Sequence, residues 1–324
     1  MITIVGLGEA LWDVLPGGKV LGGAPLNVAC HVHALLQCSA GASPSRNLRG
    51  GQAVVASRVG TDALGDEVVR ELARRGMATD FVQRDALHPT STVNVRFDVP
   101  LPGPHPAGEG PGEGQNPTFT FTPDIAWDHL EFTPDWAQLA ARCDAVCFGT
   151  LAQRSPLSRA AIWQFLDAAP QAIRLFDVNL RQGFYDGESI LEGCRRATLI
   201  KLNEHELPVV GELAGLSAGS PHDQLARLRD KFNLEAAIYT RGGGGTMMVL
   251  DSEIIDPRPE SYPMAPNSDA VGAGDACSAG VLVGWLLGLP PARIAELANH
   301  LGAFVASQPG ATPELPLTIT AMID

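Results

Sequence analysis

The sequence has no hydrophobic run that reaches the roughly 20 residues of a membrane-spanning helix, and it has no cluster of basic residues. Its 23 lysines and arginines are outnumbered by 36 aspartates and glutamates, which gives a formal net charge of −13. An acidic chain without a basic patch is a poor partner for nucleic acid and for anionic membranes. A phosphorylated ligand would therefore need local positive groups or a bound metal.

Cysteine is scarce and shows no paired pattern. The six cysteines are scattered along the chain, and none forms a Cys-x-x-Cys pair. Because a chain of 324 residues can bury a core without disulfides, we expect reduced, mostly buried thiols in a cytoplasmic protein. The segment Met1–Val5 lacks the basic residues of a secretion signal and is expected to form a first β-strand.

Three common catalytic motifs are incomplete. The stretch Val5–Leu11 begins like a dinucleotide-binding fingerprint, but Leu11 occupies the third glycine position. The Gly18-Lys19 pair lacks the upstream glycine spacing of a phosphate-binding P-loop. His205-Glu206 is followed by Val209 where a zinc hydrolase has its second histidine. These departures disfavour a Rossmann-type oxidoreductase, a P-loop enzyme and a zinc hydrolase.

Strand-like apolar runs alternate with helical patterns along most of the chain. The expected strands are Ile2–Leu7, Ala53–Val59, Ala145–Thr150, Arg174–Val178, Thr198–Leu202, Ala236–Thr240 and Thr246–Leu250. The expected helices are Leu26–Leu36, Asp62–Arg75, Pro134–Cys143, Ser158–Ala169, Ser189–Ala197, Asp223–Phe232, Gly274–Leu287 and Pro291–Ser307. Continuous apolar strands separated by helices are typical of an α/β protein with a doubly wound, mostly parallel sheet.

Two segments interrupt this alternation. Gln37–Gln52 is polar and glycine-rich, and we expect a surface loop there. Pro100–Pro117 is rich in proline and glycine, and it separates Ser91–Val99 from Thr118–Thr122, both of which alternate with a period of two. Two such strands predict a β-excursion from the main domain that can close over a substrate.

The most informative stretch lies near the C-terminus. Gly272, Ala273 and Gly274 precede Asp275, and an apolar, helical pattern follows. A flexible turn that opens a helix exposes backbone N–H groups at the positive end of the helix dipole, which forms an anion site. An aspartate there suits a base that takes a proton from a hydroxyl attacking a phosphate. From this string alone, Asp275 as an ordinary helix cap stays equally open.

A second glycine pair lies near the N-terminus. Gly22 and Gly23 precede a proline that begins a helix, and Asn27 follows in the first turn. An asparagine at this position can donate and accept hydrogen bonds to a ligand above the turn. The upstream carboxylates Glu9 and Asp13 could bind sugar hydroxyls or could simply lie in a solvated loop.

Polar or glycine-rich turns follow three successive expected strands. These turns are Asp177–Arg181, Leu202–Glu206 and Thr240–Gly245. Because the carboxyl ends of parallel strands share one edge of the sheet, three such turns favour a nucleotide and its metal. Asn203 and Glu206 could hold Mg²⁺ through waters, and Arg181 could stabilise the charge of a transferring phosphate.

Taken together, these residues resemble the ribokinase-like sugar kinases of the PfkB carbohydrate kinase family. The early family signature is similar to Gly22–Asn27 and the late one to Asp269–Asp275. Asn203–Glu206 and the Thr240–Gly245 turn lie between them in the family's order, so the likeness covers nearly the whole chain.

The resemblance implies one ribokinase-like α/β domain over residues 1–324, with a small β-sheet lid formed by about 13–22 and 90–123. It also implies ATP as phosphoryl donor, Mg²⁺, and K⁺ in a monovalent-cation loop. A homodimer through the lid stays open. The implied catalytic residues are Asp275 as base, the amides of Gly272, Ala273 and Gly274 as anion hole, and Arg181. The implied ligand-binding residues are Asp13, Gly22, Gly23 and Asn27 for the sugar; Asn203, Thr240, Gly242, Gly245 and Asn299 for the nucleotide; Glu206 for Mg²⁺ through water; and Asp269 for the monovalent cation.

Within the family, Gly8–Asp13, Ala126–Asp128 and Asp177–Arg181 look most like fructokinases. Fructose is therefore the expected acceptor, with ribose, 2-keto-3-deoxygluconate and nucleosides as rivals. A non-catalytic sugar-binding regulator is the alternative from another class, and the intact Asp275 with its glycines disfavours it.

Overall fold

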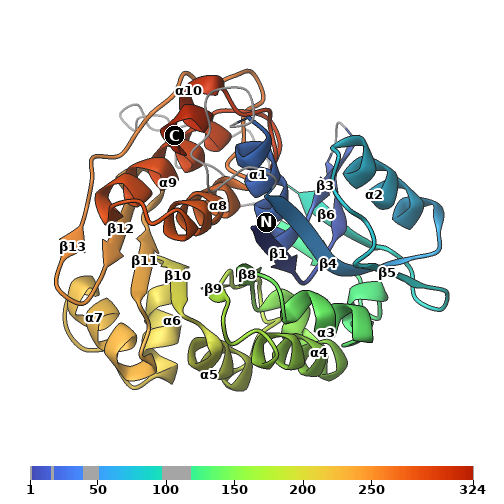
Figure 1. Cartoon of the computed structure of the whole chain (residues 1–324), viewed down its shortest axis with the longest axis horizontal. Helices are drawn as coiled ribbons and strands as arrows, with labels where there is room; N and C mark the ends of the chain where they lie inside the picture. The colour runs from blue at the N-terminus through green and yellow to red at the C-terminus, as the bar shows by residue number, and fades with distance from the viewer. Residues whose placement is uncertain (1, 16–17, 39–50, 97–117, 324) are drawn as a thin grey trace, which may run out of the picture.

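The computed structural model describes residues 2–15, 18–38, 51–96 and 118–323. The expected loops Gln37–Gln52 and Pro100–Pro117 lie largely outside these ranges. The described chain forms a large sheet covered by helices on both faces and a small separate sheet (Figure 1).

The large sheet has the strand order β13-β12-β11-β10-β9-β8-β1-β4-β5. Neighbouring strands from β11 through β5 pair in parallel, while β12 and β13 pair antiparallel at one edge. The strand bounds are β1 (Thr3–Leu7), β4 (Gln52–Gly60), β5 (Val82–Asp85), β8 (Ala145–Phe148), β9 (Ile173–Asp177), β10 (Leu199–Asn203), β11 (Ala236–Thr240), β12 (Thr246–Val249) and β13 (Ile254–Ile255). The predicted α/β class with a mostly parallel sheet is confirmed.

Helices pack on both faces of this sheet, and this burial explains the continuous apolar strands. The longer helices are α1 (Ala24–Cys38), α2 (Ala63–Arg74), α3 (Pro134–Ala140), α4 (Pro156–Asp167), α5 (Gly187–Arg196), α6 (Glu206–Leu213), α7 (Pro221–Phe232), α8 (Ala273–Leu286), α9 (Pro291–Ala306) and α10 (Leu317–Thr320). Ile4 of β1 packs into the core beneath α1, α2, α8 and α9, and its neighbour Val5 packs into the core beneath α3 to α7. Figure 1 shows these two helical layers above and below the strands.

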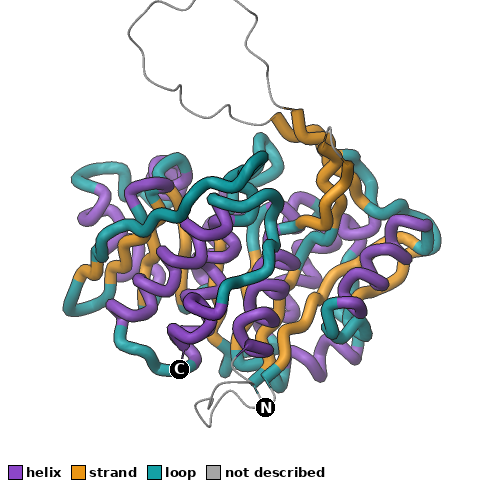
Figure 2. Tube along the Cα trace, turned by 90° about the horizontal axis from the view of Figure 1, so that it is seen from above, coloured by secondary structure: helices purple, strands orange, loops and turns teal. Residues whose placement is uncertain are grey.

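Four strands form the small sheet in the order β3-β2-β6-β7. Their bounds are β2 (Leu11–Leu15), β3 (Gly18–Gly22), β6 (Ser91–Arg96) and β7 (Thr118–Phe121). β2 pairs antiparallel with β3 and parallel with β6, which joins two segments that lie far apart in sequence. Figure 2 shows the small sheet projecting from one side of the helical body.

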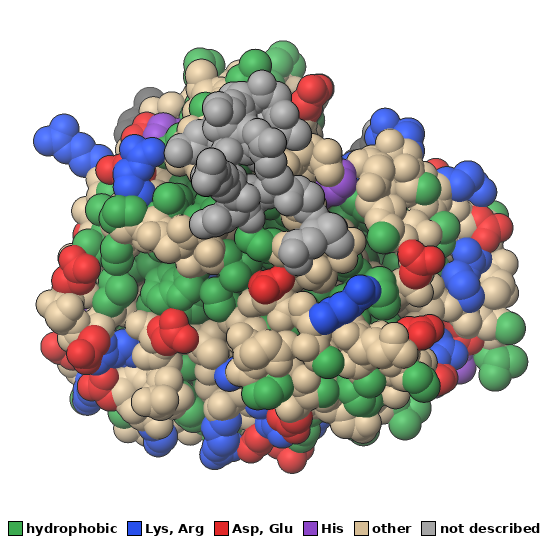
Figure 3. Space-filling model, in the orientation of Figure 1, with side chains coloured by type: hydrophobic (Ala, Val, Ile, Leu, Met, Phe, Trp, Pro, Cys, Tyr) green, Lys and Arg blue, Asp and Glu red, His purple; other side chains and the backbone are tan. Residues whose placement is uncertain are grey.

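Hydrophobic and charged side chains are unevenly distributed over the face of the molecule seen in Figure 3. Figure 3 shows hydrophobic side chains gathered near the middle of the face seen in Figure 1, with acidic and basic side chains intermingled toward its rim. Among the described residues, the helices are too short or too polar for any of them to cross a membrane. The thiols of five cysteines, Cys30, Cys143, Cys147, Cys194 and Cys277, are buried and unpaired.

Candidate active site

The first turn of α8 has the geometry of an anion site. Gly272 precedes the helix with φ +79°, a conformation that favours glycine. A Cβ at this position would also lie 2.4 Å from the carbonyl oxygen of Ala311. His31 of α1 holds that carbonyl at 2.9 Å from its Nε2. Gly272 has no side chain to cap the helix, and no side chain of the described residues accepts the N–H groups of Gly274 and Asp275, while the N–H of Ala273 donates to the carbonyl oxygen of Ala270 at 3.3 Å.

Asp275 lies in this turn and is held by a residue from the other end of the chain. Asn27 in the first turn of α1 donates its Nδ2 to Asp275 Oδ2 at 2.8 Å, and both side chains are buried. The Oδ1 atom of Asn27 is buried and accepts no hydrogen bond from the described residues. A buried acceptor of this kind needs a partner, and a ligand hydroxyl can supply one. The structure thus brings together two of the residues that the sequence predicted.

Three carboxyl groups and one guanidinium share this region. Burial raises the pKa of Glu9 to about 7 and that of Asp13 and of Asp275 to about 6. The positive charge of Arg181 lowers the pKa values of all three groups and so offsets part of the rise that burial causes. Arg181, which follows β9, is therefore within electrostatic range of all three carboxyl groups.

Asp13 and Glu9 do not lie in a solvated loop. Asp13 is part of β2, and its carboxylate occupies the space beside Gly22, where a Cβ would lie 2.3 Å from Asp13 Oδ2. Glu9 is buried, and its Oε1 accepts the N–H of Ala24 at 3.1 Å while Oε2 accepts no hydrogen bond from described residues. Gly23 joins these elements with φ +110°.

A buried ion pair lies beneath the anion site, and the sequence analysis missed it. Lys201 of β10 donates to both carboxylate oxygens of Asp177, at 2.9 and 3.0 Å, and Ser278 of α8 donates to the same carboxylate at 2.7 Å. Burial alone would lower the pKa of Lys201, but the Asp177 carboxylate raises it above its ordinary value. A Cβ on Gly274 would lie 3.3 Å from Lys201 Nζ, so an ammonium group faces the first turn of α8.

Asn203 ends β10 and Glu206 begins α6, and both side chains accept hydrogen bonds from backbone N–H groups. The Oδ1 atom of Asn203 accepts the N–H groups of His205 and Glu206, at 2.9 and 3.1 Å. The two Glu206 oxygens accept the N–H groups of Leu180 and Asn203, at 3.0 and 2.9 Å. Burial raises the pKa of Glu206. These contacts give both side chains a structural role, and their part in metal or nucleotide binding stays a prediction.

The predicted nucleotide residues beyond β11 also lie close together. Thr240 ends β11, and Gly242 begins a short 3₁₀ turn with open space where a Cβ would be. Asn299 of α9 accepts the N–H of Thr246 at 2.7 Å, and a Cβ on Gly245 would lie 3.3 Å from its Nδ2. Asn299 is itself buried and lies directly beside the glycine turn that follows β11.

Asp269 ties two loops together beside α8. Its carboxylate accepts the N–H of Val271 and the N–H of Gly310, each at 3.0 Å. Its own N–H donates to the carbonyl oxygen of Gln308 at 3.2 Å. These contacts place Gly310 and Gln308 beside Asp269, and the presence of a cation there stays a prediction.

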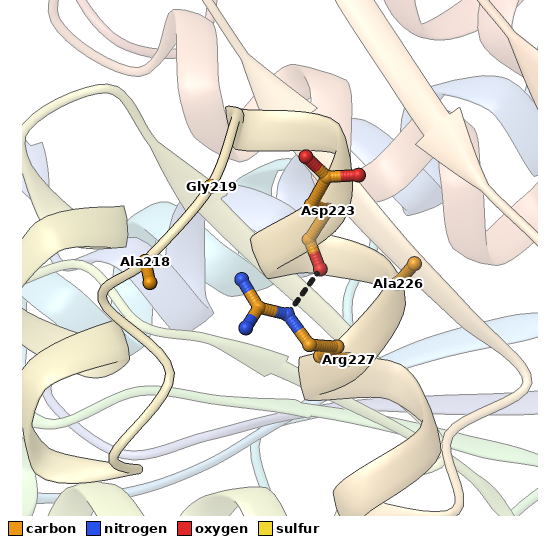
Figure 4. A pocket seen from close by; sticks show the side chains of 5 residues that line it. All are labelled: Ala218, Gly219, Asp223, Ala226 and Arg227. Atoms are coloured by element: carbon orange, nitrogen blue, oxygen red, sulfur yellow. Dashed lines mark hydrogen bonds between the residues drawn. The ribbon is translucent and has the colours of Figure 1, made fainter.

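A shallow surface hollow lies elsewhere, where α7 begins. It is lined by Ala218, Gly219, Asp223, Ala226 and Arg227 (Figure 4). Arg227 donates its Nε to the backbone carbonyl of Asp223 at 3.0 Å, one helical turn away. None of these residues belongs to the cluster around Asp275, so the hollow contributes nothing to the candidate site.

The buried carboxyl of Glu9 makes folding stability depend on pH. Its folded-state pKa of about 7 lies above the ordinary 4.5, so the fold favours the protonated form. The stability that this group contributes is complete below pH 4.5 and is lost as the pH rises through 7. Glu9→Gln mimics the protonated form, and we expect it to stabilise the fold near pH 8 by up to about 3 kcal/mol.

Urea unfolding of both proteins at about pH 5 and pH 8 measures this difference. The advantage of Glu9→Gln should shrink strongly at the lower pH. An equal effect at both pH values would mean that Glu9 ionises normally in the fold.

Comparison with known proteins identifies a family. The model of the pfkB family carbohydrate kinases matches residues 14–97 and 113–318. A fructokinase from Klebsiella pneumoniae is 29% identical over 331 residues, which cover 96% of this chain and 95% of the relative.

Solved structures with the same fold bind different acceptors. A fructokinase double mutant from Vibrio cholerae O395, with fructose, ADP and a potassium ion bound, has a TM-score of 0.75 at 21% identity and covers 100% of this chain and 99% of its own. A nucleoside kinase from Burkholderia thailandensis in complex with inosine has a TM-score of 0.72 at 19% identity and covers 99% of this chain and 96% of its own. At these identities, the likeness shows the fold.

Proposed function

Since the chain belongs to the pfkB family of carbohydrate kinases, we propose that it transfers the γ-phosphate of ATP to a hydroxyl group of fructose. The observation that carries this proposal is the buried Asp275 in the uncapped first turn of α8, hydrogen-bonded to Asn27 at 2.8 Å. A base and an anion site side by side are what phosphoryl transfer to an alcohol requires.

In the proposed mechanism, Asp275 accepts the proton of the attacking hydroxyl. With a pKa raised by burial to about 6, its carboxyl is mostly ionised at neutral pH yet more basic than an exposed aspartate. The N–H groups of Gly272 to Asp275 would stabilise the negative charge on the transferring phosphate. Lys201 beneath the turn and Arg181 beside it would add positive charge in a chain of net charge −13.

Mg²⁺ would neutralise phosphate charge during the transfer. Each Glu206 oxygen accepts one backbone N–H group and keeps lone pairs for a further partner. This arrangement fits contact with Mg²⁺ through water, as that ion prefers, and Asn203 would orient the same shell. K⁺ would bind beside Asp269, in line with the potassium ion in the Vibrio cholerae fructokinase.

The small sheet would act as a lid on a single domain. The strands β3, β6 and β7 lie within the expected lid segments, about 13–22 and 90–123, and β2 carries Asp13 into the carboxyl cluster. Closing of this sheet would exclude water from the acceptor, which strengthens every polar contact in the site.

The acceptor site favours a neutral polyol. Asp13 and the unsatisfied Oδ1 of Asn27 can pair with sugar hydroxyls. The charge of Arg181 is opposed by Glu9, Asp13 and Asp275, so little attraction remains for the carboxylate of a keto acid. A nucleoside is the second candidate, because the nucleoside kinase with inosine shares the fold.

A substrate panel tests the proposal. We expect kcat/KM to be higher for fructose than for ribose, 2-keto-3-deoxygluconate or adenosine, with ATP and Mg²⁺ present. Asp13→Ala should lower kcat/KM for fructose by about 100-fold or more. The sugar hydroxyl that Asp13 binds would lose its hydrogen-bond partner in a site from which water is excluded.

ATP affinity should change little in Asp13→Ala, which provides an internal control. If adenosine or the keto acid gives the highest kcat/KM, fructose is not the substrate, although the chain remains a kinase. Equal losses of fructose turnover and ATP affinity in Asp13→Ala would mean that Asp13 supports the fold instead of the acceptor.

A further inference from the structure

Two imidazoles and a carboxylate meet where the small sheet joins the body of the molecule. His88 lies just before β6, while Asp124 and His129 follow β7. Asp124 Oδ1 lies 2.9 Å from His129 Nε2 and 3.8 Å from His88 Nε2. One ligand atom from each of the three residues can be chosen so that all lie within 4.8 Å of one another. The proposed kinase reaction uses none of these side chains.

A buried carboxylate orients one of the imidazoles. Asp85 Oδ2 lies 3.0 Å from His88 Nδ1 and also accepts a hydrogen bond from Arg58 Nε at 2.8 Å. An ionised carboxylate beside arginine can only accept, so the proton of the neutral His88 ring is on Nδ1. The Nε2 lone pair of His88 then faces Asp124. This carboxylate–imidazole pairing is the outer-shell arrangement that metal-binding histidines use.

The backbone around the cluster is also fixed. Asp85 Oδ1 accepts the N–H groups of Leu87 and His88, at 2.8 and 3.0 Å. The His88 and His129 rings stack with centroids 3.5 Å apart and planes at 10°. Asp124 has φ +53°, which aspartate tolerates better than most residues. The two imidazoles and the Asp124 carboxylate thus lie next to one another.

We propose that His88, Asp124 and His129 form a zinc site, with Asp85 as the outer-shell partner of His88. Ligand atoms around tetrahedral Zn²⁺ lie about 3.3–3.5 Å apart, whereas His88 Nε2 lies 3.8 Å from Asp124 Oδ1. Because the ion must lie near the plane of each imidazole that binds it, one of the two stacked rings also has to turn out of the stack, so that both Nε2 lone pairs point at the ion. Two imidazoles and a carboxylate with water in the fourth position suit Zn²⁺. Mg²⁺ prefers oxygen ligands, which separates this site from the proposed catalytic metal.

Such an ion would link the two strands β6 and β7 at one end of their antiparallel pair. His88 precedes β6, and Asp124 and His129 follow β7, which pairs antiparallel with β6. Zn²⁺ bound to all three residues would hold the start of β6 against the end of β7. Amide hydrogen exchange in the backbone of these two strands would slow as a result.

Zn²⁺ titration of the full chain tests the site. After treatment with a chelator, the protein is titrated with Zn²⁺ in millimolar Mg²⁺, and binding is followed by calorimetry. We expect one Zn²⁺ per chain at micromolar or lower Kd. His129→Gln and Asp124→Asn should each weaken binding at least about tenfold, the lower end of what loss of an outer-shell partner alone causes.

Three comparisons keep the result interpretable. His222→Gln removes an exposed histidine on α7 and should leave Zn²⁺ affinity unchanged. Circular dichroism and thermal unfolding in chelator show whether each variant folds. Asp124 is 75% exposed, so Asp124→Asn remains informative even if a histidine variant is unstable. Equal Zn²⁺ affinity in wild type and Asp124→Asn, or the same loss in His222→Gln, would overturn the proposal and leave only a surface hydrogen-bond cluster.

Discussion

Replacement of Asp275 by asparagine is expected to lower kcat by roughly 100- to 10,000-fold, the range that loss of a general base produces. The side chain keeps its shape, and asparagine can still accept the hydrogen bond that Asn27 donates at 2.8 Å. The carboxylate charge and the ability to take a proton are lost together, and no bulk is added or removed near the phosphates. ATP affinity should therefore stay within several-fold. Single-turnover kinetics with ATP and fructose measure the first effect, and equilibrium binding of ATP measures the second.

An exposed acid supplies the control. Asp223→Asn on α7 removes a carboxylate of the same size outside the site, and its kcat should equal that of the wild type. Near-native turnover in Asp275→Asn would show that another group is the base. A parallel loss of ATP affinity would show that the substitution disturbs the fold of the anion site.

The pH profile gives a second measure of Asp275. Its pKa is raised by burial to about 6, so kcat/KM should fall as the pH drops below that value. The hydrogen bond from Asn27 lowers the pKa of Asp275 by favouring its ionised form. Asn27→Ala should thus move the acid limb of the profile to higher pH.

The central sheet could be predicted because burial on both faces leaves a clear pattern in the sequence. The strands β1, β8 and β11 are fully or almost fully buried, and each is a continuous apolar run. The strands β2 and β3 were not predicted from the residue pattern, and only the family resemblance placed residues 13–22 in a β-sheet lid. They are short, they contain Asp13 and Lys19, and β2 pairs with the distant β6, so that Leu11 meets Ser91. Local periodicity carries no information about such a pairing.

In the candidate site, too, some residues could be predicted from the sequence and others could not. Asn27 and Asp275 could be selected because each follows glycines that open a helix, although they lie 248 residues apart. Lys201 was overlooked, even though a lysine within the apolar run Thr198–Leu202 was a usable signal, because buried lysines need a partner. The contacts of Glu206 with Leu180 could not be foreseen, since they depend on how two neighbouring strands end.

Lys201→Met is expected to damage both stability and catalysis. Loss of the ammonium leaves the Asp177 carboxylate buried with Ser278 as its one side-chain donor among the described residues, and an unpaired buried charge costs about 3–5 kcal/mol of folding free energy. Catalysis should suffer as well, because Lys201 Nζ faces the first turn of α8. Removal of a preorganised positive group near developing charge typically lowers kcat about 100-fold or more.

The double variant Lys201→Met with Asp177→Asn separates these two effects. It removes both charges, and asparagine can still accept from Ser278, so urea unfolding should show most of the lost stability restored. The kcat should stay low, since no positive charge remains beneath the anion site. Lys201 lowers the pKa of Asp275 and Asp177 raises it, so the two substitutions have opposite effects on that pKa and largely cancel. Assays near pH 8 keep Asp275 ionised in each variant. Recovery of kcat together with stability would mean that Lys201 only neutralises Asp177; a stable but slow double variant would mean that the ammonium acts on the transferring phosphate.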